Sequence, residues 1–316
     1  DAAALANVNR GWNEDKTVWD GSKVIDTDWT DMVTQTGITQ EHTLSASGGT
    51  KDLKGFFSFG YLNNEGTQKG QEYERYSVSA SVDIQAKPWL KMGASINGAW
   101  AEQDYGYSRT GQSSSSGPTD IYGAAKAIPR YTVPYDEDGD IILQPGGSTT
   151  NVYTVIDEWK KSTENRQTFR ALGSFFAQAD FGKIWEPLEG LSYKIQFGPD
   201  FRHYRRGLFI DATSAVRMGS KNMARRDDAR YFSWTLDNMI MYNKKFDDHS
   251  VNVTLLQSAS KYNAENGSMS EVDVLVPEFL WNNMGQIDIA NTTKYDPGMS
   301  TGLTESQMSS YMARIN

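Results

Sequence analysis

An acidic stretch in the middle of the chain has the residue types of a calcium-binding loop. Residues 134–140 read Pro-Tyr-Asp-Glu-Asp-Gly-Asp, so the carboxylates of Asp136, Asp138 and Asp140 lie around a glycine. An EF-hand loop needs a glutamate at its twelfth position, and counted from Asp136 that position is Gly147. The pattern therefore favours a turn in which aspartate side chains cap the backbone, with a calcium site at these three aspartates as the alternative.

Catalytic and metal-binding motifs are otherwise absent from the sequence. The three histidines, His42, His203 and His249, lack the close spacing of a metal-binding pair. There is no cysteine, which excludes disulfides, thiolate metal ligands and cysteine nucleophiles. There is no Gly-x-Ser-x-Gly elbow and no Walker loop. We therefore expect a protein that is not an enzyme and that has no resident metal or cofactor.

Aromatic residues within long polar segments are the candidates for ligand binding. Sugar rings present apolar faces that can stack on aromatic side chains, which themselves bury large apolar areas. The alternative is that such aromatics pin the long segments to one another. The candidates are Tyr105, Tyr107, Tyr122, Trp159 and Trp281.

The charge distribution argues against a nucleic-acid partner. The formal net charge is -9, and the most basic stretch, residues 217–230, mixes Arg225, Arg226 and Arg230 with Asp227 and Asp228. A phosphate-binding surface needs a patch or stripe of basic residues without such compensation.

The elements that must position these residues are β-strands. In residues 89–100 apolar side chains occupy every second position, and Lys91, Ser95 and Asn97 fall between them. A strand places these polar residues on one side, whereas a helix of the same length would scatter them. The same alternation predicts strands at residues 40–48, around 57–61, and at 73–85, 89–100, 169–181, 191–203, 231–243 and 251–258.

Short polar turns and long polar loops alternate between these strands. That order is typical of a transmembrane β-barrel, which has short periplasmic turns and long extracellular loops. No run approaches the roughly 18 apolar residues of a membrane-spanning helix, but closed barrels need none. The expected organisation is a lead-in at residues 1–39 and barrel wall at 40–316, with extracellular loops near 62–72, 102–167, 204–229 and 261–307.

Several motifs, in order along the chain, resemble one known family. They are residues 28–31 (DWTD), 40–49 (QEHTLSASGG), 57–66 (FSFGYLNNEG), 73–77 (YERYS), 89–93 (WLKMG) and 310–316 (SYMARIN). They resemble the SusC/RagA-like, TonB-dependent outer-membrane transporters of Bacteroidetes. Members of that family are plugged barrels of about 22 strands.

The resemblance implies both a fold and a function. The fold is all-β: an antiparallel transmembrane β-barrel segment with about eight to nine strands of the larger barrel. The chain would be a fragment without the plug, the TonB-contacting segment and the C-terminal strands. The function would be TonB-driven import of a glycan or peptide nutrient across the outer membrane, with a SusD-like surface lipoprotein as partner. The rivals are a soluble or surface-anchored β-rich protein that binds carbohydrate or mediates adhesion, and a glycan hydrolase, which needs a carboxylate pair across a cleft.

Overall fold

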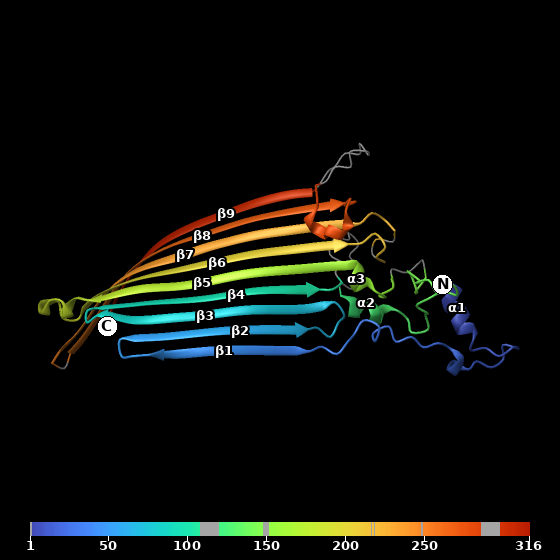
Figure 1. Ribbon diagram of the computed structural model, residues 1–316, viewed down its shortest axis with the longest axis horizontal. Coiled ribbons are helices and arrows are strands. Elements are labelled where there is room, and N and C mark those ends of the chain that lie inside the picture. The colour runs from blue at the N-terminus through green and yellow to red at the C-terminus, as the bar shows by residue number, and fades with distance from the viewer. Residues whose placement is uncertain are drawn as a thin grey trace.

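An antiparallel sheet of nine strands makes up most of the molecule (Figure 1). The computed structural model describes residues 2–107, 120–147, 152–215, 217, 219–247, 249–285 and 298–316. Each strand pairs with the next one along the sequence, so the order in space is the order in the chain. The strands are β1 (Thr39–Gly49), β2 (Leu53–Glu65), β3 (Gln71–Lys87), β4 (Leu90–Tyr105), β5 (Ser162–Asp180), β6 (Leu191–Ile210), β7 (Met223–Phe246), β8 (His249–Val272) and β9 (Gly298–Ile315).

Helices are short and lie before β1 or in the connections between strands. Three are α-helices, α1 (Ala2–Asn9), α2 (Ile121–Ala127) and α3 (Glu158–Lys161), among the described residues. The others are the 3-10 helices η1 (Gly21–Lys23), η2 (Phe181–Lys183), η3 (Glu186–Leu188) and η4 (Pro277–Asn282). None of the helices described is long and apolar enough to cross a membrane.

The sheet has two different ends. β1 and β2, β3 and β4, β5 and β6, and β7 and β8 follow one another at one end, which we call the turn end. β2 and β3, β4 and β5, β6 and β7, and β8 and β9 follow one another at the other end, the loop end. The helices α1, α2 and α3 all lie at the loop end (Figure 1). Residues 2–38 therefore enter β1 from the loop end.

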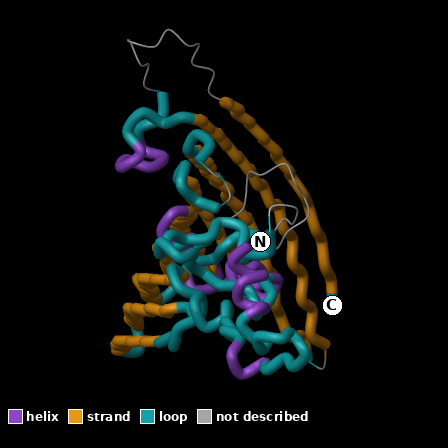
Figure 2. The backbone as a smooth tube through the Cα atoms, turned by 90° about the vertical axis from the view of Figure 1, so that its right-hand side faces the viewer, coloured by secondary structure: helices purple, strands orange, loops and turns teal. Residues whose placement is uncertain are grey.

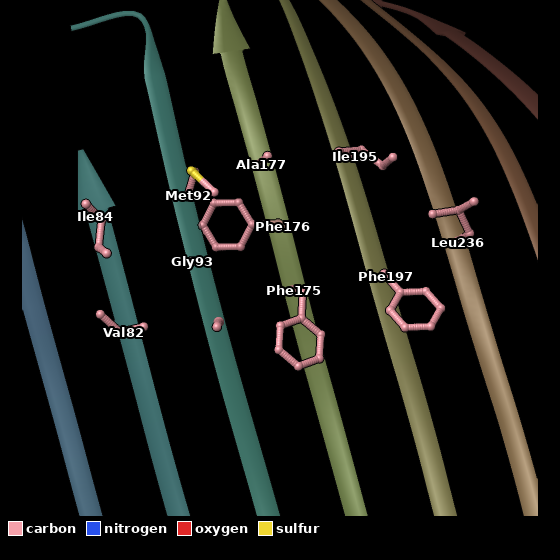
Figure 3. A pocket seen from close by; sticks show the side chains of 11 residues that line it. Val82, Ile84, Met92, Gly93, Phe175, Phe176, Ala177, Ile195, Phe197 and Leu236 are labelled. Atoms are coloured by element: carbon pink, nitrogen blue, oxygen red, sulfur yellow. The ribbon is translucent and has the colours of Figure 1, made fainter. Parts of the chain in front are cut away.

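Strand register separates the side chains of the sheet into an apolar face and a polar face. Ile84, Met92, Ala177 and Ile195 are consecutive cross-strand partners and form one row of the apolar face. Figure 3 shows this face toward the turn end, where side chains from β3, β4, β5, β6 and β7 line an apolar depression. The residues next in sequence point to the other side, since side chains alternate along a strand. On that polar face Ser258 donates a hydrogen bond to Asp237 at 2.6 Å.

A small hydrophobic cluster joins the N-terminal segment to the connection between β4 and β5. We call this unit the loop cap; its buried residues are Trp29, Val33, Ile121, Ala125, Ile128, Val155 and Ile156. The amide of Asn7 donates to the carbonyls of Ile25 (2.9 Å) and Tyr131 (2.8 Å), so α1 is held to both segments. Tyr107 packs against this cluster and against Leu208 and Ile210 of β6. The loop cap thus lies against the loop end of the sheet, as Figure 2 also shows.

Several strands extend further toward the loop end than the alternation of apolar residues predicts. Residues 204–210 and 223–229, expected in a loop, belong to β6 and β7, and residues 261–272 and 298–307 belong to β8 and β9. The extensions of β7, β8 and β9 are mostly polar, and that of β6 ends in Leu208, Phe209 and Ile210, which are buried under loop residues. The alternation that marks a membrane-facing strand therefore stops before the hydrogen-bonded ladder does. The ladder there is accompanied by ion pairs such as Arg226 to Asp228 (2.6 Å) and Arg230 to Glu265 (3.8 Å).

The predicted all-β antiparallel architecture is confirmed. Nine strands lie within the expected eight to nine, and they form a sheet that is not closed within the described residues: β1 and β9 each pair with one neighbour.

Candidate functional site

Four arginines form a block on the polar face of β5 and β6. Arg166 lies directly opposite Arg206, and Arg170 lies directly opposite Arg202. Each strand contributes its two arginines four positions apart, which keeps them on one face of the sheet. Like charges placed directly across a strand pair are destabilising, so this block needs compensating anions.

A buried glutamate compensates two of the four. Glu164 is 2% exposed, and its Oε1 accepts hydrogen bonds from Nε of Arg166 (2.8 Å) and Nε of Arg206 (2.7 Å). Asp227 of β7 lies 3.4 Å from Arg206 Nη1 and also pairs with Arg225 at 2.8 Å. The sheet carries this network across three strands because their register brings the groups level with one another.

In the second pair, Arg170 and Arg202, only Arg170 has a carboxylate partner among the described residues. Arg170 forms a two-point contact with Asp200, at 3.2 Å from Nε and 2.8 Å from Nη2. Arg202 is exposed, and its guanidinium lies 4.1 Å from the ring centroid of Tyr231 on β7. No carboxylate among the described residues forms an ion pair with Arg202. This leaves an oriented cation on the polar face of the sheet.

An aromatic row crosses the apolar face toward the loop end. The ring centroids of His42 and Tyr61 are 6.3 Å apart, those of Tyr61 and Tyr76 are 5.0 Å apart, and those of Tyr76 and Trp100 are 5.8 Å apart. Glu74 accepts hydrogen bonds from the hydroxyls of Tyr61 (3.1 Å) and Tyr76 (2.9 Å). Rings with an apolar body and a polar tip are typical of the boundary between lipid and water.

Three of the five predicted ligand-binding aromatics have a cation over the ring. The guanidinium of Arg166 lies 4.0 Å from the ring centroid of Tyr105 and donates to its hydroxyl at 3.0 Å. The Trp159 ring has Lys69 at 5.3 Å and Lys160 at 5.7 Å. The ring of Tyr122, on α2, has Lys126 at 5.3 Å.

The other two predicted aromatics pack into hydrophobic clusters. Trp281 of η4 is 6% exposed and packs with Phe209, Ala224 and Val274. Tyr107 packs against the loop cap and the end of β6. Trp281 lies over Gly207, which alternates with Arg206 and so belongs to the opposite face of the sheet. The five aromatics therefore do not converge on one surface.

The acidic stretch forms a tight turn closed by its own backbone. Asp136 Oδ1 accepts the backbone N–H groups of Asp138 (3.0 Å) and Asp140 (2.9 Å), and Gly139 takes a positive φ of 87°. Across the described ranges, no group of three or more histidine, aspartate or glutamate side chains is placed to hold a metal ion.

A second buried carboxylate anchors the loop cap to the β6–β7 connection. Both oxygens of Glu158 accept the N–H of Ala215 at 3.0 Å, and Lys161 Nζ lies 3.5 Å away. Burial raises the pKa of Glu158 above its usual value, against the opposing effect of these contacts. The side chain is fully inaccessible, so its charge depends on the Ala215 amide and Lys161.

Sequence reasoning missed the arginine block because it joins residues about 40 positions apart. The spacing of Arg166 from Arg170, and of Arg202 from Arg206, marks each pair as sharing a strand face. The missing information was the register between β5 and β6, which alternation alone does not fix.

Curated relatives match the chain along most of its length. "TonB-dependent receptor P3" of Formosa agariphila is 23% identical over 291 residues, which are 92% of this chain and 28% of the relative. The chain is homologous to the TonB-dependent receptors. "TonB-dependent receptor P26" of the same organism is 24% identical over 255 residues, covering 76% of this chain and 23% of that receptor. The chain thus spans about a quarter of the length of these receptors. No family model matches it.

Solved structures show the same strand arrangement. A chain of the RagAB peptide transporter superposes with a TM-score of 0.71 at 21% identity, over 92% of this chain and 31% of that one. The RagAB peptide importer in its "open-open" state gives a TM-score of 0.69 at 22% identity, with the same coverage. The nine-stranded sheet therefore matches part of the barrel of these transporters in fold.

The predicted likeness to TonB-dependent transporters is confirmed, since the chain is a homologue of TonB-dependent receptors. Those homologues are non-enzymatic outer-membrane β-barrels, which agrees with the location and the non-enzymatic character predicted here. In such a barrel the apolar face meets lipid and the polar face lines the interior.

Proposed function

We propose that the chain forms part of the wall and outer cap of a TonB-dependent importer that takes up peptides with a SusD-like surface lipoprotein. The turn end faces the periplasm and the loop end faces outward. Residues 2–38, predicted as a lead-in to the barrel, would contribute to the outer cap, since they pack against residues 120–147 and 152–161 at the loop end.

The state of the predicted sugar-binding aromatics is the observation that supports peptides over glycans. Stacking of a sugar ring needs an open aromatic face, and the rings of Tyr105, Trp159 and Tyr122 each have a cation against them that competes for such a face. Trp281 is buried. The polar face instead offers charges of both signs, such as the arginine block with Glu164 and Asp200, which suit the charged and amide groups of peptides.

The exposed surface of the loop cap supports a partner on the outer side. Leu5, Val18 and Trp19 expose 63%, 62% and 48% of their surface, and Trp12 exposes 40%. Apolar groups gathered on the outside of a protein often mark an interaction site. A SusD-like lipoprotein is the partner that the likeness to the RagAB complex suggests.

Uptake by whole cells tests this function. Cells with and without the full-length protein would be given fluorescent short peptides and fluorescent oligosaccharides in parallel, with a protonophore to collapse the energy supply. We expect peptide uptake that requires both the protein and the energised membrane. Loss of oligosaccharide uptake on deletion, with peptide uptake unchanged, would contradict the proposal.

A further inference from the structure

We propose that Arg202, held by Tyr231 and next to Arg170, is a carboxylate-recognition site that makes the importer prefer acidic peptides. This inference rests on the proposed function and adds the charge of the cargo to it. The site lies on the polar face of β5, β6 and β7, where cargo would pass.

The local charge count leaves positive charge unneutralised. Five arginines and three carboxylates occupy this part of the polar face, counted over the described residues. They are Arg166, Arg170, Arg202, Arg206 and Arg225, with Glu164, Asp200 and Asp227. Asp200, two positions before Arg202 on the same face, is engaged by Arg170 at two points. Every carboxylate of the group is thus occupied, and Arg202 is left for an external anion.

The geometry of Arg202 prepares it for that anion. Stacking at 4.1 Å over Tyr231 fixes the plane of the guanidinium while its N–H edges stay accessible, since the residue is exposed. A planar guanidinium matches the two oxygens of a carboxylate and loses less freedom on binding when it is already oriented. Direct cross-strand opposition of Arg170 and Arg202 costs stability in the unliganded protein. A bound carboxylate would relieve that repulsion.

Matched peptides measure this preference on the purified full-length protein with its partner. One peptide alternates alanine and glutamate, and the other has glutamine in place of every glutamate, so the two differ in charge and hardly in shape. Fluorescence-based equilibrium titration in detergent gives both affinities. We expect the glutamate peptide to bind about tenfold more tightly at low salt, with the advantage shrinking as salt is raised.

Substitution of Arg202 connects the preference to the site. Arg202→Gln should reduce the tenfold preference to about twofold or less, and Arg202→Lys should retain part of it because the charge remains and the stacked plane is lost. Arg230→Gln is the control, because Arg230 is an exposed arginine adjacent to Tyr231 on the opposite face. Thermal unfolding of each variant checks that the barrel is intact.

The possible outcomes distinguish failure of the carboxylate site at Arg202 from failure of the proposed peptide import. Equal binding of the two peptides by the native protein, or full preference retained in Arg202→Gln, overturns the carboxylate site and leaves peptide import standing. Binding of neither peptide overturns the proposed function itself. Tight binding of oligogalacturonate with no binding of the glutamate peptide would assign the site to acidic glycans, and so would also overturn the inference.

Discussion

At the scale of single residues, the polar face is organised by buried carboxylates that serve more than one cation. Glu164 is almost inaccessible and accepts from both Arg166 and Arg206, so it compensates two charges that the register places opposite each other. Removing this carboxylate leaves Arg166 without its carboxylate partner and Arg206 with Asp227 alone.

Glu164→Ala should therefore destabilise the protein by about 1.5–3 kcal/mol, the cost of losing hydrogen bonds to a charged group while the arginines stay partly exposed. The control Glu305→Ala removes an exposed partner, which lies 3.8 Å from Lys261, and should cost no more than about 1 kcal/mol. Urea unfolding of the full-length protein in lipid measures both. A loss at Glu164 as small as that at Glu305 would show that the arginines find other partners.

Glu158 gives the loop cap a dependence on pH. Because its pKa is raised in the folded protein, the folded state holds this proton more tightly than the unfolded state. Its contribution is fully present below the unfolded value of about 4.3 and is lost as pH rises through the raised folded pKa.

Glu158→Gln should flatten that dependence, because the amide keeps an oxygen for the N–H of Ala215 and cannot ionise. Hydrogen exchange of the Ala215 amide between about pH 4 and pH 7, corrected for intrinsic exchange, gives the opening free energy at this site and so measures its dependence on pH. An unchanged slope in the variant would assign the pH dependence to another group.

At the scale of elements, the sequence predicts the order and type of strands better than their ends. The alternation of apolar residues marks the part of each strand that faces lipid, and it predicted the first eight strands in order; the ninth was expected from the motif at residues 310–316. It misses the loop-end extensions of β6 to β9, where pairing continues although the alternation of apolar and polar residues has ended. The predicted aromatics and the arginine block show the same limit at the site, because contacts between distant segments depend on register and loop packing.

The loop-end extension of β6 is covered by η4, whose Trp281 packs directly on Gly207. A Cβ at Gly207 would overlap the indole ring, so the absence of a side chain there is what admits Trp281. Gly267, on the loop-end extension of β8, offers a comparison, since a Cβ there would meet no atom closer than the Ser300 carbonyl oxygen at 3.8 Å.

Gly207→Ala should displace Trp281 from its cluster, with a cost of about 1–3 kcal/mol from overpacking. Gly267→Ala should stay within about 0.5 kcal/mol of the native protein. Urea unfolding gives the two costs, and accessibility of tryptophan to iodide quenching reports whether η4 has moved. Equal behaviour of the two variants would contradict the packing of Trp281 on Gly207.

At the scale of the whole molecule, the two faces of the sheet suit different surroundings, lipid on the apolar face and the barrel interior on the polar face. Leu236 and Thr235 are neighbours on β7, yet Leu236 lines the apolar depression of Figure 3 and Thr235 points to the polar face. The two faces follow from strand geometry alone, and they allow a matched comparison at one level of the membrane.

Leu236→Arg should impair assembly, because an arginine near the middle of the lipid face of a barrel costs about 2–4 kcal/mol. Thr235→Arg introduces the same side chain toward the interior and should assemble like the native protein. Heat-modifiable migration of the full-length protein from outer-membrane fractions measures the folded share of each. Normal assembly of Leu236→Arg would contradict the assignment of the apolar face to lipid.

The most direct test of the whole account is to identify what the native protein carries. The full-length protein would be extracted from outer membranes in mild detergent, and its bound partners and small ligands identified by native mass spectrometry. The account predicts a complex with a surface lipoprotein that releases a mixture of short peptides, enriched in glutamate and aspartate. A complex that releases oligosaccharides and no peptides would contradict it.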